Sequence, residues 1–122
     1  MWNAPTQDQL SQIPKLYKTE HIPLHQKVVW AHLFCGSSDW FVFEIHEGGD
    51  LMFCFAILGG DYDNSELGYV SLSELKSINV NGIEVDFDLF WTPCSANEIR
   101  SICRAKNWEL QQPNKQMANL TA

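Results

Sequence analysis

Residues 59–75 read GGDYDNSELGYVSLSEL, and this stretch decides how the rest of the chain is arranged. It opens with two glycines and an acidic turn over residues 59–66, where glycine and asparagine supply unusual backbone angles. A short strand, LGYVS, follows the turn. Ser71 and Glu74 then stand three residues apart, which is the capping-box spacing of a helix start. The stretch therefore predicts a turn, a strand and a helix, with a sheet built before them.

Three apolar runs precede the turn, at residues 28–35, 39–46 and 51–58. They are rich in β-branched and aromatic residues, which is typical of strands. The links between them, residues 36–38 and 47–50, have hairpin length. We therefore expect an antiparallel meander. The third run is apolar on both faces, which predicts a central strand that is covered on both sides.

The chain after the turn predicts a helix over residues 72–78, a strand over 83–90 and a helix over 96–106. The strand alternates, so one face is expected to be core and the other wet and acidic. The core face would carry Ile83, Val85, Phe87 and Leu89, and the acidic face would carry Glu84, Asp86 and Asp88. The last helix begins at a second capping box, Ser95 and Glu98. It would turn Ile99, Ile102 and Cys103 inward.

The N-terminal part predicts a short helix over residues 6–12 that ends before Pro14. Residues 14–27 form an extended arm over the sheet, for which we expect the anchors Leu16, Tyr17, Ile22 and Leu24. Residues 1–110 then make a single α+β domain, and residues 111–122 a flexible polar tail. Its fold class is an antiparallel sheet of about five strands in meander order with two to three short helices, two of them packed against one face.

Charge is distributed unevenly along the 122 residues, whose formal net charge is −7. Residues 28–99 hold twelve Asp and Glu against a single base, Lys76. A net charge of this sign argues against a general DNA- or RNA-binding surface. Two interpretations remain open. The carboxylates either solubilise the domain or form a surface that imitates nucleic acid and seeks a basic partner.

The four cysteines, Cys35, Cys54, Cys94 and Cys103, form no CxxC pair and match no zinc spacing. We expect buried, reduced thiols in a cytoplasmic protein of a bacterial host cell. The N-terminus is polar and lacks the apolar region of a signal peptide. No apolar run reaches the roughly 18 residues of a membrane span, so we expect no membrane association.

Chemistry is weakly indicated. His32 and His46 lie on neighbouring predicted strands and could approach each other. One alternative is that they build a metal site with Cys35 or Glu44, and a metal-dependent enzyme or accessory protein with the acidic face. An EF-hand starting at Asp61 fails because its sixth position is not Gly. No nucleophile motif or phosphate-binding glycine loop occurs. We therefore predict a protein that is not an enzyme and has no metal or cofactor.

Two strings carry a family resemblance: PKLYKTEHIPLHQK at 14–27 and GYVSLSEL at 68–75. Together with FAILGGDY at 55–62 and SANEIRSIC at 95–103, they resemble the bacterial domain of unknown function 2958. Proteins of this family are small and are often carried on plasmids, phages and other mobile elements. The resemblance implies a mobile-element accessory protein and transfers no catalytic residues.

We expect a small acidic binding protein, in its most concrete form an anti-defence, anti-CRISPR-like inhibitor. It would bind the basic nucleic-acid site of a host nuclease or other nucleic-acid-binding protein, without binding nucleic acid itself. Spaced carboxylates on a rigid sheet can imitate a phosphate array, and exposed tyrosines can anchor an interface. The expected partner-binding residues are Asp61, Tyr62, Asp63, Glu66, Tyr69, Glu84, Asp86 and Asp88. A structural subunit of a larger assembly is a further alternative.

Overall fold

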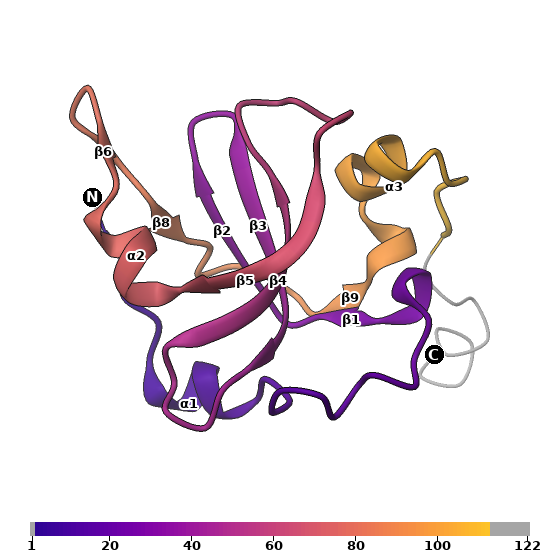
Figure 1. Ribbon diagram of the computed structural model, residues 1–122, viewed down its shortest axis with the longest axis horizontal. Coiled ribbons are helices and arrows are strands. Elements are labelled where there is room, and N and C mark those ends of the chain that lie inside the picture. Colours follow the sequence, from indigo (N-terminus) through magenta and orange to yellow (C-terminus); the bar gives the residue numbers. More distant parts are fainter. Residues whose placement is uncertain (1, 113–122) are drawn as a thin grey trace.

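A five-stranded antiparallel sheet forms the centre of the computed structural model, which describes residues 2–112. Four strands are consecutive along the chain, and a late strand, β8, joins the far edge beside β2 (Figure 1). The order is β5-β4-β3-β2-β8. The strands are β2 (Ala31–Cys35), β3 (Ser38–Ile45), β4 (Leu51–Ile57), β5 (Glu66–Ser71) and β8 (Asp86–Phe87). The predicted α+β class and its meander are confirmed.

Two short pairings lie outside this sheet. One joins β1 (Val28–Val29) to β9 (Cys94–Ser95), and the other is the hairpin of β6 (Asn79–Val80) and β7 (Ile83–Glu84). The single strand predicted over 83–90 is therefore wrong, because its first half pairs with β6 and its second half with β2. Because the two halves pair with different strands, the apolar residues of 83–90 do not all face the core. Val85 and Phe87 are buried, whereas Ile83 and Leu89 are exposed.

The helices are short, and side chains fix where they begin. Thr6 and Gln9 form a capping box at α1 (Gln7–Ser11), and the Glu74 backbone N–H donates to Ser71 Oγ at α2 (Leu72–Ser77). Ser95 and Glu98 cap a 3-10 turn, η2 (Ala96–Glu98). The helix predicted over 96–106 is interrupted at Ile99, whose backbone is extended, so that α3 spans Arg100–Lys106. The remaining 3-10 turn is η1 (Leu24–Gln26).

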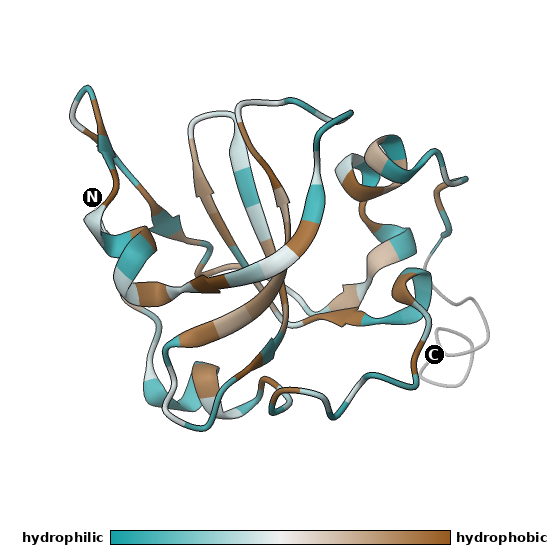
Figure 2. Cartoon of the chain, viewed as in Figure 1, coloured by the Kyte–Doolittle hydropathy of each residue, from teal (hydrophilic) through white to brown (hydrophobic). Residues whose placement is uncertain are grey.

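Apolar side chains cover both faces of the sheet, and the helices divide between them. Leu10 of α1 and Leu75 of α2 pack on one face with Trp40. Ala96 of η2 and Ile102 of α3 pack on the other. Figure 1 shows α1 and α2 on one side of the strands and α3 on the other, and Figure 2 shows the apolar residues along the central strands. Two helices, α1 and α2, therefore share one face as predicted, and α3 covers the opposite face.

The covering of both faces confirms that the run 51–58 is a central strand. Met52 and Cys54 face one cluster, and Phe55 and Ile57 face the other. The arm contacts the sheet where Lys15 pairs with Ile45 and the Leu16 N–H donates to the Ile45 carbonyl at 3.2 Å. Its predicted extended form is wrong, because residues 16–21 form turns closed by their own backbone hydrogen bonds. The flexible tail expected from residue 111 lies, apart from residues 111 and 112, outside the described residues.

Candidate protein-binding surface

The turn between β4 and β5 is held by its own backbone and side chains. Gly59 and Gly60 take left-handed angles, with φ of 60° and 71°, which glycine adopts without steric cost. Asp61 accepts hydrogen bonds from the Asn64 N–H at 3.3 Å and from Asn64 Nδ2 at 2.7 Å. Its carboxylate therefore stabilises the turn itself, which is the behaviour of an Asx turn. Asp61, Asp63 and Glu66 all remain exposed to solvent.

Tyr62 of this turn lies differently from its acidic neighbours. It is half-buried against the α3 side of the sheet, and the Arg104 guanidinium lies 4.3 Å above the centre of its ring. This cation–π contact fastens the turn to α3. Of the two tyrosines expected to anchor an interface, Tyr62 is thus engaged within the protein.

β5 is an edge strand whose residues 66–69 are all exposed. Within the described part of the chain, no strand pairs with its outer side. Leu67 and Tyr69 point to one face, and the Tyr69 ring packs on Phe53 of β4 with centroids 5.2 Å apart. An open strand edge with exposed apolar side chains is a template for another chain. The acidic turn adjoins its first residue.

A second tyrosine belongs to this surface, and its predicted role as an anchor of the arm is wrong because its side chain faces solvent. Tyr17 of the arm is 60% exposed and has a left-handed backbone, with φ of 71°. Hydrogen bonding with the Tyr17 side chain is the main cause that raises the pKa of Tyr69. Burial and the nearby charges of Glu44 and Glu20 raise it further. Tyr17 and Tyr69 thus stand together beside the edge strand.

Beneath these tyrosines lies Glu44, which is only 3% exposed. It accepts hydrogen bonds from the Tyr17 N–H at 2.8 Å, the Thr19 N–H at 3.0 Å and the Thr19 hydroxyl. The Lys27 ammonium bonds the Thr19 carbonyl and hydroxyl. Burial raises the pKa of Glu44, but these hydrogen bonds and Lys27 outweigh it and hold the pKa below its usual value.

Sequence reasoning considered Glu44 only as a metal ligand and missed this role. The available signal was a single glutamate within the apolar run WFVFEI, opposite the polar string YKTE of the arm. A buried carboxylate requires donors, and the backbone of the arm supplies them. The β3–β4 register also shifts between Val42 and Glu44, as at a β-bulge.

The carboxylates of residues 84–88 lie at the other edge of the sheet, with β4, β3 and β2 between them and β5. They are half-buried and engaged. Glu84 accepts from the Trp2 N–H at 3.0 Å, and Asp86 accepts from Asn3 N–H at 2.9 Å and Nδ2 at 2.7 Å. The expectation of a free, wet face is wrong here, because the N-terminal segment covers it. The six expected carboxylates do not form one array.

Asp88 belongs to a separate cluster around His32. The His32 Nε2 lies 2.7 Å from Asp39 and Nδ1 lies 3.2 Å from Asp88, so each ring nitrogen faces a carboxylate. The ring also stacks on Phe41 with centroids 4.9 Å apart. The two nitrogens of an imidazole point in opposite directions, so these carboxylates do not converge with them on one point.

His46 lies far from this cluster. His32 pairs with Phe41, and His46 follows five residues later along the chain, which at strand spacing is roughly 17 Å. His46 Nδ1 accepts from the Gly48 N–H at 3.0 Å. Within residues 2–112, no three His, Cys, Asp or Glu side chains lie close enough together to hold a metal ion. The expected approach of His32 and His46 is wrong.

All four cysteines carry free thiols. Cys54 and Cys103 are buried as expected, whereas Cys35 and Cys94 are half-buried. Burial raises the pKa values of the Cys54, Cys94 and Cys103 thiols, which disfavours the reactive thiolate. None of these three has the environment of a nucleophile.

Comparison with known proteins identifies the family. Residues 6–98 match the family described as Protein of unknown function (DUF2958), so the chain belongs to that family. The match includes the arm, the whole meander and the acidic turn. No curated protein and no solved structure matches the chain. No helix among residues 2–112 is long and apolar enough to cross a membrane.

Proposed function

We propose that this chain is a non-enzymatic binding protein that docks on a basic segment of another protein through β5 and the acidic turn. The observation that carries the proposal is the open edge of β5, where exposed Leu67 and Tyr69 adjoin the carboxylates of Asp61, Asp63 and Glu66. Backbone groups at a free edge supply affinity, and flanking side chains supply selectivity. The carboxylates select a partner rich in lysine and arginine.

The chemical character of the partner follows from the charges around this edge. Three carboxylates within six residues attract a cationic surface and repel nucleic acid. The exposed Tyr69 and Tyr17 rings supply the rigid, amphipathic area that dominates interface energies. Glu84, Asp86 and Asp88 are assigned to structure rather than to the interface, because the N-terminal segment and His32 already occupy them.

The biological form of the proposal is an anti-defence inhibitor of a mobile element, similar to an anti-CRISPR protein. It would act in the bacterial cytoplasm, without a cofactor, by covering the basic nucleic-acid site of a host nuclease. The support is the resemblance to a family carried on mobile elements, together with the acidic edge. The capture experiment described next would identify the target.

Capture of partners from bacterial lysate, followed by mass spectrometry, tests the proposal with matched variants. One variant reverses the turn: Asp61→Lys, Asp63→Lys and Glu66→Lys. Its control carries the same change of charge at exposed carboxylates elsewhere: Asp8→Lys, Glu47→Lys and Glu109→Lys. We expect a basic nucleic-acid-binding protein to be retained by the wild type and the control and lost by the turn variant. Loss with both variants, or with neither, contradicts the assigned surface.

A further inference from the structure

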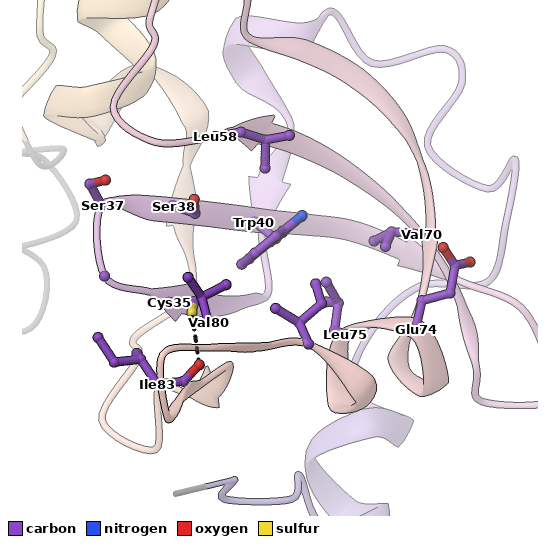
Figure 3. A pocket seen from close by; sticks show the side chains of 12 residues that line it. Cys35, Ser37, Ser38, Trp40, Leu58, Val70, Glu74, Leu75, Val80 and Ile83 are labelled. Atoms are coloured by element: carbon purple, nitrogen blue, oxygen red, sulfur yellow. Dashed lines mark hydrogen bonds between the residues drawn. The ribbon is translucent and has the colours of Figure 1, made fainter.

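An apolar hollow lies apart from the β5 edge face that carries Leu67 and Tyr69. It has a volume of about 550 Å³ and lies between the β2–β3 turn, the ends of β4 and β5, α2 and the β6–β7 hairpin. Figure 3 shows Trp40 at its centre, with Cys35, Val80 and Leu75 around the indole. Sites for small molecules have volumes of about 300–1,000 Å³ and mostly apolar walls.

Three large apolar side chains at this hollow are left in contact with water. Leu58, Val80 and Ile83 are each more than half exposed; Leu58 follows β4, and the other two face each other across the β6–β7 hairpin. Their convergence concentrates apolar surface in one concave place, where burial by a ligand would be favourable. An apolar body is therefore the part of a ligand that the walls select.

The Trp40 indole supplies a directed polar group. Trp40 is 6% exposed, yet its N–H donates to none of residues 2–112, whereas the Trp91 indole N–H bonds the Val29 carbonyl at 2.9 Å. Every side-chain nitrogen or oxygen that is fully buried in that range has a partner, so the Trp40 nitrogen is not fully buried. Trp40 lines both this hollow and a smaller one beside β5, and the two share Val70. Buried indoles usually find an acceptor, and here a ligand can provide it.

One charged side chain also influences which ligand the hollow prefers. Among residues 2–112, Glu74 is the only charged residue that lines the hollow. In Figure 3 its carboxylate lies at the Val70 end, toward which the indole nitrogen also points. A ligand with its polar end there would meet a donor and a negative charge. An uncharged acceptor can accept a hydrogen bond from the Trp40 N–H and is not repelled by the Glu74 carboxylate.

We infer that this hollow binds a small apolar molecule whose polar end is an uncharged hydrogen-bond acceptor, such as an alcohol, in preference to the corresponding carboxylate. The site is independent of the proposed β5 interface. Its ligand class follows from the apolar walls, the free indole N–H of Trp40 and the carboxylate of Glu74.

The test uses 1-octanol and octanoate, which share a chain and differ in the charge of the acceptor. The two are titrated into the full chain labelled with ¹⁵N, and the Trp40 indole N–H resonance is followed, assigned by its disappearance in Trp40→Phe. We expect a saturable shift and binding of octanol about fivefold tighter than octanoate, the upper range for an exposed charge. No saturable shift, or equal affinities, overturns the inference.

Variants separate the contributions. Glu74→Gln should leave octanol unchanged and bring octanoate to within about twofold of it. Val80→Asp should weaken both ligands, whereas Phe90→Asp, at a side chain 93% exposed away from the hollow, should weaken neither. Affinity in these variants is followed through the backbone amides of residues 37 and 38. Unchanged binding by Val80→Asp, or equal loss in Phe90→Asp, contradicts the assigned site.

Discussion

Glu44 shows how a single charged residue organises its surroundings. It is buried in β3, and the arm residues Tyr17 and Thr19 turn their N–H groups toward its carboxylate. Replacement by glutamine keeps the shape but removes the charge that these donors and Lys27 stabilise. We expect Glu44→Gln to lower the free energy of unfolding by about 2 kcal/mol, because hydrogen bonds to charged groups exceed neutral ones. Urea unfolding measures this, and the exposed control Glu47→Gln should change it by less than about 0.5 kcal/mol.

The same carboxylate predicts a dependence of stability on pH. The pKa of Glu44 is lower in the folded protein than its usual value of 4.5. The folded state therefore gains stability from the ionised group above that value and loses it as the pH falls through the folded pKa. Urea midpoints measured between neutral and acid pH should fall less steeply for Glu44→Gln than for the wild type. Parallel profiles for the two proteins would contradict the assignment.

At the scale of the element, the N-terminal segment holds the β7–β8 edge. Asn3 donates two hydrogen bonds to Asp86, and the Phe87 N–H donates a third at 3.1 Å. We expect Asp86→Ala to lower the free energy of unfolding by about 1 kcal/mol and to speed amide exchange in β8, because the donors lose their acceptor. The matched change Asp63→Ala, in the exposed turn, should do neither. Equal effects of the two would mean that Asp86 is a surface charge.

The strands and helix starts that could be predicted from the sequence are those whose signal lies within their own residues. The runs 39–46 and 51–58 carry their β signal locally, and the capping pairs at Ser71 and Ser95 mark real starts. The single strand predicted over 28–35 is wrong, because the run divides at Trp30 into β1, which pairs with β9, and β2, which pairs with β3. The split of 83–90 was not predictable, since the partner of β8 is β2, roughly fifty residues earlier. Of the candidate site, the exposed turn and Tyr69 could be found by composition. The burial of Glu44 and the covering of Asp86 depend on the distant arm and N-terminus.

For the whole molecule, folding controls the accessibility of the thiols. Cys54 is buried within the sheet, whereas Cys35 is half-buried and lines the apolar hollow. We expect the native protein to react slowly with a thiol reagent, at Cys35 first and at Cys54 last, and the unfolded protein to react at all four. Mass spectrometry of labelled peptides gives the order. Labelling of Cys54 as fast as Cys35, or a disulfide in the native protein, would contradict it.

The distribution of charge over the whole molecule makes a prediction about how the partner binds. Carboxylates at the acidic turn act on a basic partner before contact, so they should raise the association rate, whereas Tyr69 acts after contact and should set the dissociation rate. The Debye length, over which salt screens charges, falls from about 10 Å at 0.1 M salt to about 3 Å at 1 M. Raising salt should therefore slow association of the wild type and leave dissociation nearly constant, as measured by surface plasmon resonance with the captured partner.

The turn reversal should remove the dependence on salt, and Tyr69→Ala should keep it while dissociation becomes faster. Binding that is insensitive both to salt and to the turn reversal would exclude charge imitation and place the interface on the apolar surface of Leu67, Tyr69 and Tyr17 alone.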